Sequence, residues 1–214
     1  MPLSSPVILG VAGGTGSGKT TVARALLEAV GRQRLAFLAQ DSYYRDVPWE
    51  NPEQLARHNF DHPSAIDTER LVADLARLKE GLSIEAPVYD FVNHCRKDVT
   101  VRVEPRTVVM VEGILLFAEP SIRQLLDFKI YVDTDADVRL MRRIQRDMQE
   151  RGRQLDDILR QYMESVRPMH LEFVEPSKRW ADVIVPEGGE NRVALGMVAA
   201  RVEQLLEKAE ARGQ

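Results

Sequence analysis

A glycine-rich segment near the start of the chain carries the most structural information. It reads Gly13-Gly14-Thr15-Gly16-Ser17-Gly18-Lys19-Thr20 and lies between an apolar run, residues 7–12, and a helical pattern, residues 20–30. Glycines allow successive backbone N–H groups to converge on an anion, and the helix that follows adds the positive end of its dipole. A simple glycine-rich turn would explain the glycines but not Lys-Thr at this spacing. In this strand–loop–helix context the pattern predicts binding of ATP or GTP.

Two side chains of this loop have predicted roles of their own. Lys19 is expected to reach the β- and γ-phosphates of the nucleotide, and the Thr20 hydroxyl is expected to ligate Mg²⁺. The other residues of the segment, from Gly13 to Gly18, are expected to cradle phosphate through their backbone.

The rest of the chain alternates short apolar segments with longer helical patterns, which is typical of a parallel sheet covered by helices on both faces. The expected strands are residues 7–12, 35–39, 108–111, 128–132 and 183–185. The expected helices are residues 20–30, 67–80, 136–149, 155–174 and 192–211, with Pro168 kinking or dividing the fourth. We therefore predict an α/β fold of the P-loop NTPase type with a five-stranded parallel sheet.

One region departs from this rhythm. Residues 87–91 form a short strand pattern, and residues 99–103 alternate apolar and polar side chains. Together they predict an antiparallel β-hairpin appended to the main sheet, an insertion of about residues 84–104. Such an insertion could clamp a substrate.

Composition limits the classes of partner. The 214 residues are 44% hydrophobic and 29% charged, which fits one globular domain and disfavours a disordered chain. The formal net charge of −4 argues against a surface built for nucleic acid, so any anion site must be local. No apolar run approaches the ~20 residues of a membrane helix, and Cys95 is the single cysteine. We expect a cytoplasmic protein without nucleic-acid or membrane partners.

Ligands of open parallel sheets bind beyond the carboxyl ends of the strands, which draws attention to the acidic residues there. Asp41 follows the strand at residues 35–39. It could accept the proton of an acceptor hydroxyl, or it could merely cap a turn; spacing alone favours neither.

Two further acids end strands. Glu112 follows the strand at residues 108–111, where it could serve Mg²⁺ opposite Thr20. Asp133 precedes a helical pattern, and we expect it to cap that helix.

The segment from Arg139 to Arg153 contains six arginines and two acids, a local excess of four positive charges. Its expected apolar side consists of Val138, Met141, Ile144 and Met148, leaving Arg142, Arg143 and Arg146 toward solvent or a ligand. A solvated helix face is the common meaning of such a run. Beside a phosphate loop, however, we favour an Arg-rich helical lid over about residues 139–161. No aromatic residue is interleaved for stacking on bases, which disfavours nucleic acid.

Motifs of other nucleotide-binding classes are missing from the sequence. There is no N-K-x-D or D-x-x-G string of a regulatory GTPase and no L-S-G-G-Q string of a transporter ATPase. A kinase for a small molecule is the class that remains. A nucleotide-binding regulator without turnover is the alternative from a different class.

With these residues in hand, the chain resembles the uridine kinase (uridine/cytidine kinase) family, within the wider group that includes phosphoribulokinases. The resemblance runs from about residue 7 to residue 201 and rests on an ordered set of strings. Besides the glycine-rich loop these are Gln40-Asp41-Ser42-Tyr43-Tyr44, Asn59-Phe60-Asp61-His62-Pro63, Pro87-Val88-Tyr89-Asp90-Phe91, Glu112-Gly113-Ile114-Leu115, Asp133-Thr134-Asp135, Arg151-Gly152-Arg153 and Ala181-Asp182-Val183-Ile184-Val185-Pro186.

The resemblance implies transfer of the γ-phosphate of ATP or GTP, with Mg²⁺, to the 5′-hydroxyl of uridine and cytidine in pyrimidine salvage. It implies a single P-loop kinase domain over residues 1–214 and a homo-oligomer, with tetramers common in the family. It assigns catalysis to Asp41 as base beside Lys19, and the metal to Thr20 and Glu112. Arg146 and Arg151 resemble lid arginines that contact the phosphates.

Nucleoside contacts are also implied by the resemblance. It assigns them to Tyr44, Phe60, Asp61, Tyr89, Phe91, His94, Arg143, Arg153 and Gln161. Asp61 and Arg143 would hold the ribose hydroxyls, and His94 would face the 4-substituent of the pyrimidine. A kinase for another hydroxyl acceptor, of the phosphoribulokinase or pantothenate kinase kind, is the alternative; a sugar phosphate would favour basic residues over aromatic ones in the hairpin.

Overall fold

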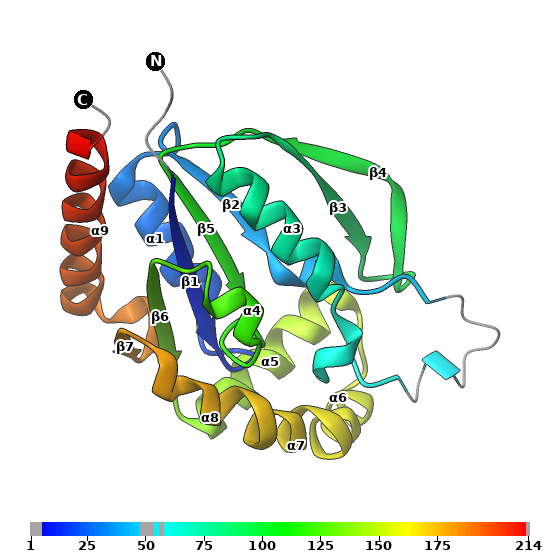
Figure 1. Cartoon of the computed structure of the whole chain (residues 1–214). Coiled ribbons are helices and arrows are strands. Elements are labelled where there is room, and N and C mark those ends of the chain that lie inside the picture. The colour runs from blue at the N-terminus through cyan, green and yellow to red at the C-terminus, as the bar shows by residue number, and fades with distance from the viewer. Residues whose placement is uncertain (1–5, 48–53, 56–57, 213–214) are drawn as a thin grey trace.

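A parallel sheet of five strands runs through the middle of the structure (Figure 1). Its strands are β1 (Val7–Gly13), β2 (Leu35–Ala39), β5 (Val108–Gly113), β6 (Phe128–Asp133) and β7 (Val183–Pro186). The order in the sheet is β2-β5-β1-β6-β7, so the strand that leads into the phosphate loop is central. The computed structural model describes residues 6–47, 54–55 and 58–212. All five predicted strands are present, and the prediction of a five-stranded parallel sheet is confirmed.

Helices cover both faces of the sheet (Figure 1). The helices α1 (Lys19–Val30) and α9 (Arg192–Arg212) pack on one face, and α3 (Thr68–Lys79) and α4 (Pro120–Arg123) pack on the other. Successive side chains of a strand point to opposite faces, so Ile8 belongs to one core and Leu9 to the other. No helix within the described ranges is long and apolar enough to cross a membrane.

The insertion forms a small sheet of its own. β3 (Ile84–Asp90) and β4 (Cys95–Val103) pair in antiparallel fashion, with an irregularity between Pro87 and Tyr89. The predicted hairpin insertion is confirmed, and it forms a two-stranded sheet separate from the main sheet, because its strands pair only with each other. The helix α3 lies between the hairpin and the main sheet (Figure 1).

The arginine-rich helix α5 (Ala136–Arg151) is oriented differently from the prediction. Its buried positions are Arg139 and Arg143, each 6% exposed, and Asp147 at 0%, spaced four residues apart. Of the predicted apolar side, Met141 and Met148 are 60% and 47% exposed and Val138 and Ile144 are only half-buried. The predicted apolar side is therefore wrong. A charged stripe can be buried when each charge has partners. Here the stripe faces the glycine-rich loop: Arg143 donates to the Thr15 hydroxyl, 3.2 Å away.

Asp133 does not cap α5 as predicted. Its carboxylate accepts a hydrogen bond from Lys178 Nζ at 3.0 Å, which draws it away from the helix. Asp135 occupies the N-cap position, but its side chain makes no capping hydrogen bond.

The fourth predicted helix is a chain of short pieces rather than one regular helix. α6 (Leu155–Gln161), α7 (Arg167–Met169) and α8 (Glu175–Ser177) are separated by π-helical stretches, Tyr162–Val166 and His170–Val174. Pro168 lies in α7, between the two π-helical stretches, and the backbone keeps helical φ and ψ angles on both sides of it. The hydrogen-bonding pattern changes around this proline, but the predicted division of the helix is not found. The 3-10 turns Gln40–Tyr43, Pro63–Ala65, Lys178–Trp180 and Gly188–Glu190 complete the fold.

Candidate active site

The phosphate loop connects the central strand β1 to α1. Gly16 and Gly18 have φ angles of 73° and 94°, which L side chains rarely adopt, and a side chain at Gly16 would also overlap the backbone carbonyl of Arg139. Lys19 Nζ donates to the Gly14 carbonyl at 3.0 Å, which folds the lysine back over the loop. Burial lowers the pKa of the Lys19 amine, with Glu112 opposing this shift.

Glu112 and Thr20 lie side by side at the mouth of the loop. The Thr20 hydroxyl donates to Glu112 Oε1 at 2.9 Å, whereas Glu112 Oε2 is buried without a hydrogen-bond partner among the described residues. Burial raises the pKa of the Glu112 carboxyl, with the charge of Lys19 opposing it. The Thr20 hydroxyl and the Glu112 oxygen that lacks a hydrogen bond are two oxygen ligands that suit Mg²⁺. This ion binds one or two protein ligands together with waters and phosphates.

Asp41 projects from the turn Gln40–Tyr43 that follows β2, and both ends of this turn are anchored. The buried side-chain oxygen of Gln40 accepts from Leu115 N at 2.9 Å, and the Tyr43 hydroxyl donates to Asp74 at 2.8 Å. With its neighbours fixed, the Asp41 side chain lines the same cavity as Lys19 and Glu112. This is a suitable place for a base that serves a hydroxyl near the γ-phosphate.

One cavity of about 150 Å³ brings the predicted side chains together. Its lining consists of Thr15, Lys19, Thr20, Asp41, Tyr44, Phe60, Asp61, Tyr89, Phe91, His94, Glu112, Gly113, Ile114, Arg143, Arg146, Arg151, Arg153 and Gln161. The remaining predicted residues, Gly13, Gly14, Gly16, Ser17 and Gly18, form the loop itself. Gly113 and Ile114 also line the cavity and were not predicted as site residues, although they directly follow Glu112.

The recess away from the phosphate loop has aromatic walls. Tyr44 contacts Phe60 and Tyr89, with ring centroids 5.5 and 5.2 Å apart, and Phe60 contacts His94 at 5.0 Å. Tyr89 in turn contacts Phe91 at 5.3 Å. His94 has a φ angle of 52°, uncommon for a residue other than glycine and often associated with functional sites. Burial, together with Arg153 and Arg151, lowers the pKa of His94, so its ring is neutral near pH 7.

A buried carboxylate lies beside these rings. Asp61 is 8% exposed, and burial raises the pKa of its carboxyl, with the charge of Arg143 opposing this shift. Arg143 also donates to Gln161 Oε1 at 2.9 Å, and Arg153 donates to the same oxygen at 2.6 Å. The recess therefore combines flat apolar walls with a small set of fixed polar groups, the usual make-up of a small-molecule site.

Several residues that shape this site have no signal in the sequence. Asp147 stands at the centre of an arginine cluster, and Arg96 donates to the Tyr44 carbonyl at 2.9 Å and to Asp67 at 2.9 Å. His170 accepts from Arg139, the residue whose guanidinium lies next to Gly14. The spacing of Arg143 and Asp147 at i and i+4 could have suggested an ion pair, but nothing local indicates that it is buried.

A phosphate loop at the carboxyl end of a parallel sheet, with an acidic side chain and a substrate recess opposite it, defines a phosphotransferase of the P-loop class. Comparison with known proteins gives the family. The phosphoribulokinase/uridine kinase family model matches residues 8–194, and the chain belongs to this family of kinases.

Among the relatives, a protein named uridine kinase from Clostridium botulinum (strain Okra / Type B1) is 50% identical over 206 residues, covering 96% of this chain and all of the relative. A protein named uridine kinase from Chloroflexus aurantiacus (strain ATCC 29366 / DSM 635 / J-10-fl) is 52% identical over 202 residues, covering 94% and 97%.

Solved structures extend the likeness at the level of the fold. The D-glycerate 3-kinase of Cryptococcus neoformans var. grubii has a TM-score of 0.62 at 18% identity, covering 86% of this chain and 87% of that one. The phosphoribulokinase of Rhodobacter spheroides has a TM-score of 0.61 at 14% identity, covering 86% and 70%.

Proposed function

We propose that this protein is a nucleoside kinase that transfers the γ-phosphate of ATP or GTP to the 5′-hydroxyl of uridine and cytidine. The products are UMP or CMP and the nucleoside diphosphate. One observation carries the proposal: a single cavity contains the phosphate loop, Asp41, and an aromatic recess with the buried carboxylate of Asp61. Relatives about 50% identical over nearly the whole chain bear the name uridine kinase, which supports it.

The recess suits a pyrimidine nucleoside. A flat pyrimidine ring packs well against aromatic walls such as Tyr89 and Phe91, and Tyr44 and Phe60 extend those walls. A neutral His94 can donate to uracil O4 or accept from the cytosine amino group by changing tautomer, which accounts for the use of both bases.

The buried polar groups of the recess bind the ribose. The Asp61 carboxylate can accept from the ribose hydroxyls, with Arg143 beside it and Arg153 and Gln161 as further nucleoside contacts. A 2′-deoxynucleoside would leave Asp61 without one partner, at a cost of about 1–3 kcal/mol.

At the reacting centre, Asp41 accepts the proton of the 5′-hydroxyl as its oxygen forms a bond to the γ-phosphorus. The bond from the γ-phosphorus to the bridging oxygen of the donor breaks, and ADP or GDP leaves. Lys19 stabilises the charge on the phosphates from the loop side, and Arg146 and Arg151 do so from α5, as a lid over about residues 139–161. Thr20 and Glu112 would hold Mg²⁺, which supplies charge neutralisation on the transferring phosphate.

The surroundings of the reaction are part of the proposal. The family resemblance supports a single kinase domain over residues 1–214, an enzyme of pyrimidine salvage in the cytoplasm, and a homo-oligomeric assembly.

A coupled assay of ADP release tests the proposal. Purified protein with ATP and Mg²⁺ is given uridine, cytidine, 2′-deoxyuridine, ribulose 5-phosphate or pantothenate. We expect turnover with uridine and cytidine, and kcat/KM about 5- to 150-fold lower with 2′-deoxyuridine. No turnover with either ribonucleoside would overturn the proposal. Turnover with ribulose 5-phosphate or pantothenate but with no nucleoside would point to a kinase of another kind. Tight ATP binding without turnover on any acceptor would point to a regulator.

A further inference from the structure

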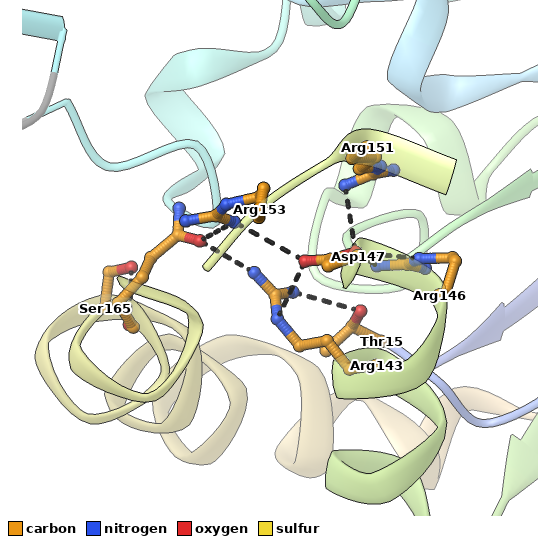
Figure 2. A network of polar contacts seen from close by, with 8 residues as sticks. Thr15, Arg143, Arg146, Asp147, Arg151, Arg153 and Ser165 are labelled. Atoms are coloured by element: carbon orange, nitrogen blue, oxygen red, sulfur yellow. Dashed lines mark hydrogen bonds and ion pairs between the residues drawn. The ribbon is translucent and has the colours of Figure 1, made fainter. Parts of the chain in front are cut away.

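Asp147 lies at the centre of the arginine cluster shown in Figure 2. Its side chain is completely buried, with 0% exposure, in the last turns of α5. The Oδ1 atom accepts two hydrogen bonds from Arg146, at 3.0 and 2.8 Å, and lies 3.5 Å from a terminal nitrogen of Arg151. These two arginines are the ones proposed to contact the donor phosphates.

The other carboxylate oxygen pairs with the two arginines that are proposed to contact the nucleoside. Asp147 Oδ2 lies 3.4 Å from Arg153 and 3.7 Å from Nε of Arg143. Both arginines also donate to Gln161, and all three side chains line the proposed nucleoside recess. The cluster lies where the two subsites meet, because Arg143 also donates to Thr15 of the phosphate loop and the Arg151 guanidinium lies 5.5 Å from the centre of the Phe91 ring. A single carboxylate thus pairs with arginines that border both subsites.

The local backbone holds this arrangement. Gly152 adopts a left-handed conformation, with φ at 62°, and ends α5. The backbone N–H groups of Gly152 and Arg153 both donate to the carbonyl of Asp147, which turns the chain so that Arg153 returns to the Asp147 side chain. Burial opposes ionisation of the Asp147 carboxyl, but the charges of Arg146 and Arg143 outweigh it and lower the pKa, so the carboxylate is charged.

We propose that Asp147 is a positioning residue that couples the two subsites, so that binding of the triphosphate strengthens binding of the nucleoside. This inference rests on the proposed nucleoside kinase function. Phosphate oxygens compete with Asp147 Oδ1 for Arg146 and Arg151. Once those arginines turn to the phosphates, the carboxylate is shared by fewer cations and attracts Arg143 and Arg153 more strongly. The nucleoside then meets arginines that are already ordered, which reduces the entropy lost on binding.

Isothermal titration calorimetry tests this coupling directly. Uridine affinity is measured with and without Mg²⁺ and a non-hydrolysable ATP analogue in the wild-type protein and in Asp147→Asn, a substitution of nearly equal size. We expect the analogue to tighten uridine binding about fivefold or more in the wild type, and by less than about twofold in Asp147→Asn. The charge-conserving Asp147→Glu is expected to restore part of the coupling, which a loss of packing alone would not do.

The matched control is Asp157→Asn on α6, whose carboxylate pairs with Arg160 at 2.6 Å but is 50% exposed. This variant is expected to keep the wild-type coupling, because exposed ion pairs contribute little. Either of two results overturns the coupling but not the proposed function. One is a folded Asp147→Asn variant with the wild-type coupling, and the other is a wild type whose uridine affinity does not change with the analogue. A wild type that binds no nucleoside in either condition overturns the proposed function, and this inference with it.

If Asp147→Asn does not fold, Arg146→Gln provides the test. This substitution releases Oδ1 as the phosphates would, so uridine affinity without the analogue should rise about threefold toward the value with the analogue. The analogue should then add little. An unchanged or weaker uridine affinity without the analogue would contradict the coupling.

Discussion

The two ends of the cavity are built in different ways. The phosphate end comes from one continuous segment, residues 13–20, and depends on backbone groups and glycine conformations. The acceptor end is assembled from side chains that are far apart in the sequence, among them Asp61, His94 and Arg143. The phosphate cradle therefore needs only a local turn between a strand and a helix, to which Glu112, Arg146 and Arg151 are added from β5 and α5. Acceptor recognition needs the hairpin, the 59–62 segment and α5 to be placed correctly at once.

This difference has a consequence for where substitutions act. Changes at the acceptor end, away from the phosphate loop and from the arginine cluster around Asp147, should alter acceptor kinetics while leaving the donor KM nearly constant. Asp41 is the exception, because it lies where the two ends meet and would serve the chemical step rather than the binding of either substrate.

The largest expected effect is that of Asp41→Asn. An amide cannot take up the proton of the 5′-hydroxyl, so we expect kcat to fall by ~10² or more. The KM values for uridine and ATP should change by less than about threefold, because the amide keeps the size of the side chain. Steady-state kinetics with both substrates varied checks this.

The control for this variant is Asp98→Asn, an exposed aspartate on β4, which should retain wild-type kinetics. An unchanged kcat in Asp41→Asn would assign Asp41 to the structure of its turn. A large rise in the uridine KM at constant kcat would make Asp41 a residue of the acceptor end. It would then not serve the chemical step between the two ends.

The difference between the two ends also explains what could be predicted from the sequence. The five strands and the phosphate loop were predictable because they depend on local patterns, namely apolar runs and glycine spacing. Asp61 and His94 carry no local signal, and only the family resemblance singled them out. The α5 helix was predicted, but its buried face was predicted wrongly, because periodicity assumes that apolar residues face inward. Arg139, Arg143 and Asp147 are buried because they pair with one another and with residues of other elements.

Arg96 offers an intermediate test at the acceptor end. From β4 it donates to the Tyr44 carbonyl at 2.9 Å and pairs with Asp67 at 2.9 Å, with the two side chains only 17% and 20% exposed. It thereby ties the hairpin, which carries His94, to the segment that follows Asp41. In Arg96→Met we expect the uridine KM to rise about fivefold, or about 1 kcal/mol, with the ATP KM within about twofold of the wild type.

Arg102→Met is the matched control on the same strand. Arg102 pairs with Glu104 at 2.7 Å, but the two side chains are 65% and 49% exposed, so its loss should leave both KM values unchanged. Equal rises in the KM values for uridine and ATP in Arg96→Met would show that the two ends are not independent in this respect.

The smallest expected effect lies beneath the phosphate end, at His170. Its Nε2 accepts from Arg139 at 3.0 Å, and its Nδ1 is buried without a hydrogen-bond partner among the described residues. Burial, assisted by Arg139 and Lys19 and opposed by Glu175 and Asp133, lowers the pKa of His170 to about 4. The folded protein therefore resists protonation at this ring.

The unfolded chain takes up this proton near its ordinary pKa of 6.5, so below that pH it binds more protons at this site than the folded protein. Stability from this group is complete above pH 6.5 and is lost progressively as the pH falls toward 4. Between pH 7.5 and pH 6 we expect His170 to lower the free energy of unfolding by about 0.8 kcal/mol. His170→Gln can still accept a hydrogen bond from Arg139 but does not titrate. In urea unfolding, the free energy of unfolding of this variant should therefore fall by about 0.8 kcal/mol less between pH 7.5 and pH 6 than that of the wild type. An equal fall in the free energy of unfolding of the wild type and of His170→Gln would mean that His170 has an ordinary pKa in the folded protein. The imidazole that contacts Arg139 would then not be held in its neutral form.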